Sequence, residues 1–412
     1  MSRPDDGHSA PERLHALDAV RGFALLLGIV FHASGSFVPA AAPFWGVEDR
    51  HRTAVLAVVY FTTHVFRMTT FFLIAGFFGH MSFHRRGARG FIRDRLKRIA
   101  LPLAVGWPIM FLAMFALPGW PTLSADGAHA SAAHGSWPPR FDLTHLWFLY
   151  VLLEFYAAIL ILRAGVAWID RRGRLRAGLD ASVAFITRSA LGSVVLGLPL
   201  AAVFLADPRW LMWFGVPTPS VSLITGAKAW VNYGAAFAFG WALHRQADLL
   251  QVLQRRWATN LGLAVALTAA SLAIAGLTPP AAPIDDLARS LAGALCYALA
   301  TWTSTFAVIG VALQFLSDYS AARRYIADSS YWLYLVHFPI VVALQMIVAR
   351  LDWPWPLKFA AILTVAFSLM YVSYQRFVRY GAIGAILNGP RKRLIPAEVA
   401  PRGGVEVRQE TT

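Results

Sequence analysis

The chain has 412 residues, of which 57% are hydrophobic and only 14% are charged, and its single cysteine is Cys296. This composition is too apolar for a water-soluble domain of that length and is typical of a protein that crosses a membrane several times. One cysteine excludes an intramolecular disulfide bond and a metal site built from several thiolates. The net charge of +15 would by itself fit a nucleic-acid-binding protein, so the positions of the basic residues must decide that point.

Ten apolar segments are each long enough to cross a hydrocarbon core of about 30 Å as an α-helix. We therefore predict an all-α polytopic membrane protein with about ten transmembrane helices, at residues 17–38, 54–80, 99–118, 143–163, 189–206, 223–243, 257–277, 289–316, 330–350 and 356–378. The membrane domain covers residues 17–379. We expect a polar cytoplasmic tail at 1–16, without the apolar core of a signal peptide, and a flexible cytoplasmic tail at 380–412.

The basic residues predict the orientation of these helices. If both termini are cytoplasmic, the cytoplasmic segments hold 27 of the 37 Lys and Arg residues, whereas the external segments hold 8. Short loops rich in Lys and Arg stay in the cytoplasm, so we expect a multi-pass protein of the cell inner membrane whose partner is the lipid bilayer. The same bias accounts for the positive net charge, and we predict no binding of nucleic acid. The oligomeric state is not predicted.

The first predicted helix carries the clearest candidate site. The eleven residues from Arg21 to His32 turn an α-helix three times plus about 20° and cover about 16 Å, so both side chains and Gly28 share one face. Asp18 lies one turn before Arg21, close enough to pair with it. Ionisable groups inside a membrane are costly and usually face a cavity, so we predict that His32 is a general base acting on a hydroxyl group. Alternatively, His32 packs against a neighbouring helix and Arg21 only extends to the membrane surface.

A second set of polar residues lies in the second and fourth predicted helices. Arg67 is in the middle of an apolar segment, with His64 one turn before it, and an unpaired arginine there would be expensive. We expect Glu154 to be its partner, either at a substrate site or as a structural contact between helices.

Three more residues are candidates for substrate binding. His145 and Trp147 lie at the start of the fourth predicted helix, and His337 precedes a proline, where it could instead bind carbonyl groups freed by the kink. His129 and His134 fall in a Gly- and Ala-rich external loop, where we expect solvated side chains and no metal site.

Four stretches of the chain resemble the acyltransferase-3 family of integral membrane enzymes. They are Leu17-Asp-Ala-Val-Arg-Gly-Phe-Ala with His32, Phe71-Phe-Leu-Ile-Ala-Gly-Phe-Phe, Arg95-Leu-Lys-Arg98, and Ser330-Tyr-Trp-Leu-Tyr-Leu-Val-His337-Phe-Pro. Many members have Ser where this chain has Ala75. Phe66-Arg67-Met68 and the stretch from His145 to Glu154 are similar to the branch that contains the glucan biosynthesis protein C succinyltransferases.

The resemblance implies an enzyme whose donor substrate is cytosolic acyl-coenzyme A, with no tightly bound cofactor. Arg95 and Arg98 would hold the coenzyme phosphates, and the pantetheine arm would extend towards His32. His32 would take the proton of an extracytoplasmic glycan hydroxyl, while an arginine or tryptophan donor stabilises the oxyanion. Both acetyl and succinyl donors remain open. The alternative function is a transporter or flippase of a carbohydrate or lipid-linked substrate, although the chain lacks the repeated halves common in carriers.

Overall fold

The computed structural model describes residues 10–40, 42–117, 141–280 and 282–389, and these residues form helices and no strand. The predicted all-α fold class is confirmed. The first half contains α1 (Ala10–Ser34), η1 (Gly35–Phe37), α2 (Ala42–Trp45), α3 (Ala54–Arg95), η2 (Leu96–Ala100), α4 (Leu101–Phe115), η5 (Thr144–Leu146), α5 (Trp147–Ile169), α6 (Arg174–Arg188) and α7 (Gly192–Leu205). The second half contains η6 (Met212–Phe214), α8 (Ala227–Leu243), η7 (His244–Leu249), α9 (Leu250–Arg255), α10 (Trp257–Ala275), α11 (Leu287–Phe315), α12 (Ala321–Val348), α13 (Trp355–Ser373), η8 (Tyr374–Val378) and α14 (Ala382–Leu387).

The number of membrane spans differs from the predicted ten. Among the described residues, seven segments are long and apolar enough to cross a membrane, or eight if α6 and α7, bent by 102°, form one broken span. The predicted spans 189–206 and 223–243 correspond to α7 and α8, which have 14 and 17 residues. These lengths give about 21 and 26 Å of helix, less than a hydrocarbon core of about 30 Å. The count of ten is therefore not confirmed.

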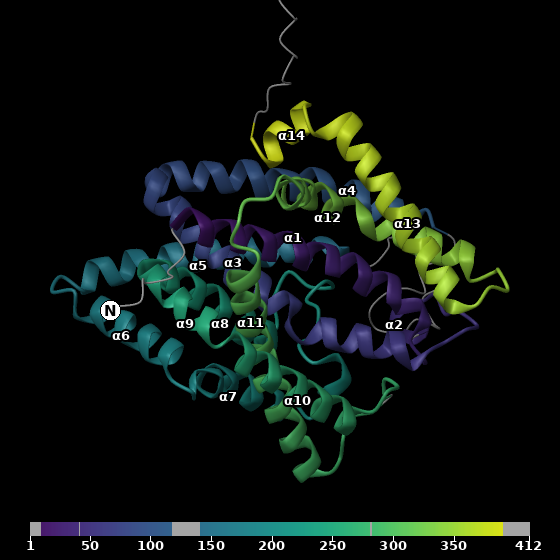
Figure 1. The fold of residues 1–412 in the computed structure, drawn as a ribbon, viewed down its shortest axis with the longest axis horizontal. Helices are drawn as coiled ribbons and strands as arrows, with labels where there is room; N and C mark the ends of the chain where they lie inside the picture. Colours follow the sequence, from purple (N-terminus) through teal and green to yellow (C-terminus); the bar gives the residue numbers. More distant parts are fainter. Residues whose placement is uncertain (1–9, 41, 118–140, 281, 390–412) are drawn as a thin grey trace, which may run out of the picture.

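One of the seven segments, Ala54–Phe115, is a hairpin that runs through α3, η2 and α4. Gly87 has φ +67° and ψ 178°, a conformation essentially restricted to glycine, and it breaks α3 into two arms. Arg95 donates to Ser82 Oγ at 3.3 Å, although a straight helix would separate these residues by about 20 Å along its axis. The chain therefore reverses direction at Gly87, and Figure 1 shows α4 running back above α3 and α1.

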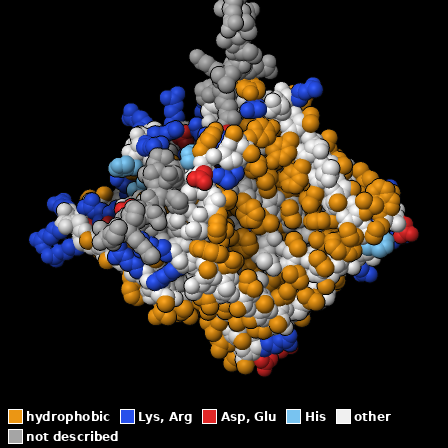
Figure 2. All heavy atoms as spheres, in the orientation of Figure 1, with side chains coloured by type: hydrophobic (Ala, Val, Ile, Leu, Met, Phe, Trp, Pro, Cys, Tyr) orange, Lys and Arg blue, Asp and Glu red, His pale blue; other side chains and the backbone are white. Residues whose placement is uncertain are grey.

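The two ends of the bundle differ in charge. One end, called here the basic end, contains residues 84–98 and 171–188: His80 lies between His84 and His244, and Arg245 pairs with Asp180 of α6. Trp45 and residues of the loop 207–221 line one cavity at the opposite end, where Figure 1 shows α2. Figure 2 shows Lys and Arg side chains gathered on the left, where α6 lies, beside a broad apolar face. This distribution is typical of a membrane protein with one strongly basic surface.

Helix α6 lies within the predicted connection 164–188. Its Asp180 forms a salt bridge with Arg245 of η7 at 2.8 Å, which fixes the polar side of the helix to the bundle. Leu175, Leu179 and Phe185 are exposed, as expected for an amphipathic helix lying along a membrane surface. The sequence predicts no membrane span here, because the segment has too few apolar residues. Its apolar residues nevertheless recur at helical spacing, which fits the observed helix.

Helices α3 and α8 pack closely because each has a glycine at the contact. A Cβ atom added at Gly76 would lie 2.0 Å from the Phe237 carbonyl oxygen, and one added at Gly240 would lie 1.9 Å from the Leu73 carbonyl oxygen. Small residues let membrane helices approach in this way. Gly76 belongs to the Phe-rich stretch of the family resemblance, so that motif has a direct packing role.

We expect Gly76→Ala to lower the free energy of unfolding by about 1–3 kcal/mol, because two backbones must move apart to admit one methyl group. Unfolding in detergent micelles would measure the change. Gly262→Ala in α10 is the matched control, since nothing lies within 4 Å of its added Cβ atom. Equal stability of the two variants would contradict the close-packing account.

A buried ion pair joins the start of α13 to the loop before α3. Lys358 Nζ lies 2.9 and 2.8 Å from the two carboxylate oxygens of Asp49, and the two side chains are only 0% and 1% exposed. Lys358 is one of the eight basic residues that the sequence assigns to the external segments, where an exposed charge is expected. The structure instead buries it, because Asp49 supplies the compensating charge.

The end of the described chain packs against the basic end. Asn388, just after α14, donates to the Asp328 carbonyl oxygen of α12 at 2.7 Å. These residues belong to the segment predicted as the start of the C-terminal tail; residues 390–412, as well as His129 and His134, lie outside the described residues.

Candidate active site

A cavity of about 510 Å³ lies between α1, α3, α5, α8 and α12. It reaches the surface near the exposed residues Arg209 and Val221, at the end of the bundle opposite the basic end. From there it extends inward to Ala24 on α1. Its polar and aromatic wall includes His32, Trp45, Tyr60, His64, Arg67, Asp142, His145, Trp147, Asp207, Lys228, Tyr233, Tyr334 and His337. Of the predicted site residues, His32, Arg67, His145, Trp147 and His337 are thus brought together.

His32 occupies an aromatic position in this wall. Its ring is stacked 5.5 Å from Trp45, and it lies 5.0 Å from Phe338 and 5.1 Å from His337, measured between ring centroids. The backbone carbonyl of His32 accepts a hydrogen bond from Gln345 of α12 at 2.9 Å, which fixes this turn of α1. Its Nδ1 atom is buried and has no hydrogen-bond partner among the described residues.

The other three histidines of the cavity bind backbone carbonyl groups. His64 Nε2 lies 2.7 Å from the Phe214 oxygen, His145 Nε2 3.0 Å from the Leu335 oxygen, and His337 Nδ1 2.7 Å from the Tyr334 oxygen. Each of these nitrogens must carry a proton to donate such a bond, which fixes the ring and its tautomer. Pro339 has no N–H for the Leu335 carbonyl, and His145 binds that carbonyl, whereas His337 contacts the Tyr334 carbonyl of its own helical turn.

Arg67 projects from α3 towards α1. Its guanidinium group lies over the Phe31 ring at 4.7 Å, and a Cβ atom added at Gly28 would be 2.3 Å from Arg67 Nη1. The predicted pairing with Glu154 is wrong: Glu154 accepts a hydrogen bond from Thr225 at 2.6 Å, and it does not line the cavity. Helix periodicity could not show whether Glu154 contacts Arg67 or another residue, because it does not place α3 relative to α5.

The mouth of the cavity carries two acidic residues in different environments. Lys228 forms a salt bridge with Asp207 and holds the pKa of that carboxyl group below its usual range. Burial raises the pKa of Asp142, although its carboxylate accepts a hydrogen bond from the Thr144 amide at 2.6 Å. Both acidic groups therefore have their own local partners.

Asp18 and Arg21 lie at the basic end and do not line the cavity. Arg21 pairs with Asp18 at 3.1 Å, as the spacing predicted, and Asp18 also contacts Arg324 of α12 at 3.4 Å. The pair therefore joins α1 to α12, about three turns away from His32.

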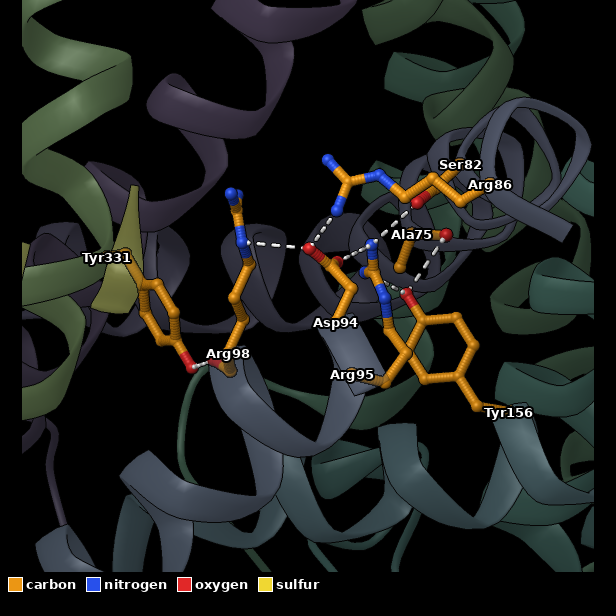
Figure 3. A network of polar contacts seen from close by, with 8 residues as sticks. All are labelled: Ala75, Ser82, Arg86, Asp94, Arg95, Arg98, Tyr156 and Tyr331. Atoms are coloured by element: carbon orange, nitrogen blue, oxygen red, sulfur yellow. Dashed lines mark hydrogen bonds and ion pairs between the residues drawn. The ribbon is translucent and has the colours of Figure 1, made fainter. Parts of the chain in front are cut away.

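The predicted coenzyme-binding arginines surround one carboxylate near the tip of the hairpin (Figure 3). Asp94 pairs with Arg95 at 2.8 Å, with Arg98 at 3.1 Å and with Arg86. Arg95 also donates to Tyr156 of α5 at 3.2 Å. Three guanidinium groups on one carboxylate leave excess positive charge at the basic end.

This arginine cluster, formed by Arg86, Arg95 and Arg98, lies close to the inner end of the cavity. Tyr156, which binds Arg95, donates to the Ala75 carbonyl oxygen at 3.4 Å. Ala75 is one turn of α3, about 6 Å along the axis, from Phe71 in the cavity wall. About one helical turn of α3 therefore separates the contacts of the cluster from the cavity wall.

Sequence reasoning missed several cavity residues, among them Trp45, Tyr60, Tyr233 and Tyr334. One sequence pattern could have identified Tyr60: it forms a polar stripe at helical spacing with His64 and Arg67 in an otherwise apolar segment of α3. The described residues contain no group of three or more His, Cys, Asp or Glu side chains placed to hold a metal ion.

The sequence of the chain is similar to those of known proteins. The sequence profile of the acyltransferase-3 family, described as an acyltransferase domain, matches residues 14–375. Proteins named glucans biosynthesis protein C from Salmonella paratyphi B, Salmonella dublin and Salmonella enteritidis are each 29% identical to the chain over 200 residues, which is 46% of this chain and 48% of each relative. The chain thus spans about half the length of these relatives. No solved structure matches it.

Proposed function

Because the chain belongs to the acyltransferase-3 family, we propose that it moves an acetyl or succinyl group from cytosolic acyl-coenzyme A to a hydroxyl group of an extracytoplasmic glycan. The chain is a multi-pass membrane acyltransferase by its family and its apolar helices. The relatives named glucans biosynthesis protein C support a glucan as the acceptor. In this proposal the basic end faces the cytosol of a cell with the protein in its inner membrane.

One observation carries the role of His32. His32 Nδ1, like His64 Nδ1 and His337 Nε2, is buried without a partner among the described residues, but only the His32 ring has neither nitrogen bound to a backbone carbonyl in the described cavity wall. A general base needs such an available nitrogen within reach of the hydroxyl it deprotonates. His337 lies beside it and would limit the movement of the His32 ring.

The reaction requires one proton to move twice. His32 takes the proton of the acceptor hydroxyl as the acceptor oxygen forms a bond to the thioester carbon. The tetrahedral intermediate then collapses, the carbon–sulfur bond breaks, and the coenzyme A thiolate receives the proton from His32. The products are an ester of the glycan and free coenzyme A.

The arginine cluster at the basic end would hold the coenzyme phosphates. Guanidinium groups bind phosphate through paired, charge-assisted hydrogen bonds, and the single carboxylate of Asp94 does not neutralise all three arginines. Asp18 with Arg21 would support the groove at this end by tying α1 to α12.

We expect Arg95→Ala and Arg98→Ala each to weaken the affinity for acyl-coenzyme A by about 10- to 100-fold, since a hydrogen bond to a charged group contributes about 1.5–3 kcal/mol. The KM for the donor, measured in membranes, tests this. Arg93→Ala removes an exposed arginine from the same turn and is the control. Unchanged affinity in both cluster variants would show that the coenzyme binds elsewhere.

The proposed function as a whole is tested by comparing the masses of exported glycans from cells with and without the protein. We expect glycans that carry acetyl or succinyl esters only when the wild-type protein is present, which would identify donor and acceptor together. Glycans of unchanged mass but altered amount would instead support the transporter alternative.

A further inference from the structure

Arg67 is a buried cation without an acidic partner among the described residues. The other arginines predicted as site residues, Arg21, Arg95 and Arg98, each pair with an aspartate. The two acidic residues of the cavity wall, Asp142 and Asp207, are bound to the Thr144 amide and to Lys228. Arg67 therefore brings uncompensated positive charge into a largely apolar cavity, at a considerable cost in desolvation.

The surroundings of Arg67 direct this charge into the cavity. Phe31 covers one side of the guanidinium group at 4.7 Å, and Arg67 Nε is buried without a hydrogen-bond partner. Tyr60, Tyr233 and Tyr334 belong to the same cavity wall and contribute phenol groups, not carboxylates.

Arg67 also lies close to the proposed base. Its Nη1 atom faces Gly28, which precedes His32 by four residues, so the two groups are about one helical turn, or 6 Å, apart along α1. Both groups contact Phe31, His32 at 5.0 Å between ring centroids. A thioester carbonyl placed beside His32 can thus direct its oxygen towards Arg67.

We propose that Arg67 is a catalytic residue that donates hydrogen bonds to the oxyanion of the tetrahedral intermediate, an inference that rests on the proposed acyl transfer. As the acceptor oxygen attacks the thioester carbon, the carbonyl electron pair moves onto oxygen and gives a full negative charge. The guanidinium group stabilises that charge until the carbon–sulfur bond breaks and the carbonyl reforms. Because the charge exists only in the intermediate and the adjoining transition states, Arg67 acts on the rate more than on donor binding.

Gly28 is required for this position. A methyl group at residue 28 would lie 2.3 Å from Arg67 Nη1, so the end of the arginine side chain would have to move away from this face of α1. Gly28 thus leaves room for the Arg67 guanidinium group on the face of α1 that carries His32. A substitution at Gly28 therefore tests the position of Arg67 without removing its charge.

The test uses membranes that contain the full chain, supplied with acetyl- or succinyl-coenzyme A and glucan oligosaccharides, and it follows the release of free coenzyme A. We expect Arg67→Gln to lower kcat about 10²–10³-fold, the effect of losing one oxyanion donor, with a change in donor KM below about threefold. The loss should be equal for both donors, and Arg67→Lys should restore part of the rate. Arg350→Gln, at an exposed arginine outside the cavity, should keep the wild-type rate.

Other results would overturn the inference. An unchanged kcat in Arg67→Gln would do so, and so would an effect confined to the KM for succinyl-coenzyme A, which would assign Arg67 to recognition of the acyl carboxylate. If Arg67→Gln does not fold, Gly28→Ala provides the same readout, and full activity in that variant would also contradict the proposal. Failure of the proposed function is distinguishable, because the wild-type protein itself would then release no coenzyme A in the presence of the acceptor.

Discussion

His32→Ala is expected to lower the rate of acyl transfer by about 10²–10⁴-fold, which is the usual contribution of a positioned general base. The acceptor hydroxyl has a high pKa and attacks a thioester slowly unless its proton is removed during the attack. In the cavity, hydrogen bonds to backbone carbonyls hold the rings of the other described histidines in place, so their remaining nitrogens, such as His64 Nδ1 and His337 Nε2, cannot move to the position of the His32 ring. Transfer of labelled acyl groups from acyl-coenzyme A to glucan oligosaccharides would measure the loss.

The controls separate chemistry from folding. His51→Ala removes a histidine of the loop before α3 that lies outside the cavity wall, and it should transfer acyl groups at the wild-type rate. The His32→Ala protein should be present in membranes at the same level as the wild type and should bind the donor with similar KM. If it transfers acyl groups normally, His32 is not the base.

The second large effect is expected on stability. Lys358→Met should lower the free energy of unfolding by about 3–5 kcal/mol, because the carboxylate of Asp49 would stay buried without a compensating charge. Methionine keeps most of the side-chain length, so the loss reports charge and hydrogen bonds more than volume. Chemical unfolding in detergent micelles measures this difference.

A double variant provides the matched control for the ion pair. Asp49→Asn combined with Lys358→Met removes both charges but keeps an acceptor for the His51 amide, which binds Asp49 at 2.8 Å. We expect this protein to recover most of the lost stability, since removing both partners of a buried pair is often nearly neutral. A double variant that is less stable than Lys358→Met would contradict this explanation.

Properties of a single helix could be predicted from the sequence. The period of 3.6 residues placed Arg21, Gly28 and His32 on one face of α1 and paired Asp18 with Arg21, and the structure confirms that ion pair at 3.1 Å. Hydropathy located the apolar segments, and their composition gave the all-α fold class. The predicted ends of the helices were less accurate, because a helix can continue where hydropathy falls. The predicted spans 54–80 and 330–350 belong to helices that continue to Arg95 (α3) and begin at Ala321 (α12).

Contacts between helices could not be predicted in the same way. Periodicity says which residues share a face but not which neighbouring helix that face meets. Arg67 and Glu154 were paired by charge alone, yet the packing of α3 against α1 takes Arg67 to Gly28, while Glu154 binds Thr225. The ion pair of Asp49 and Lys358, which are 309 positions apart in the sequence, could not be predicted for the same reason.

The reversal at Gly87 has a consequence for biosynthesis. A helical hairpin enters the bilayer as a unit, and its closed tip stays on the side where its positive charges are retained. The tip of this hairpin carries Arg86, Arg95 and Arg98, the side chains assigned above to the coenzyme phosphates. The same guanidinium groups would thus hold the hairpin tip in the cytosol while the nascent chain is inserted, long before any donor is bound.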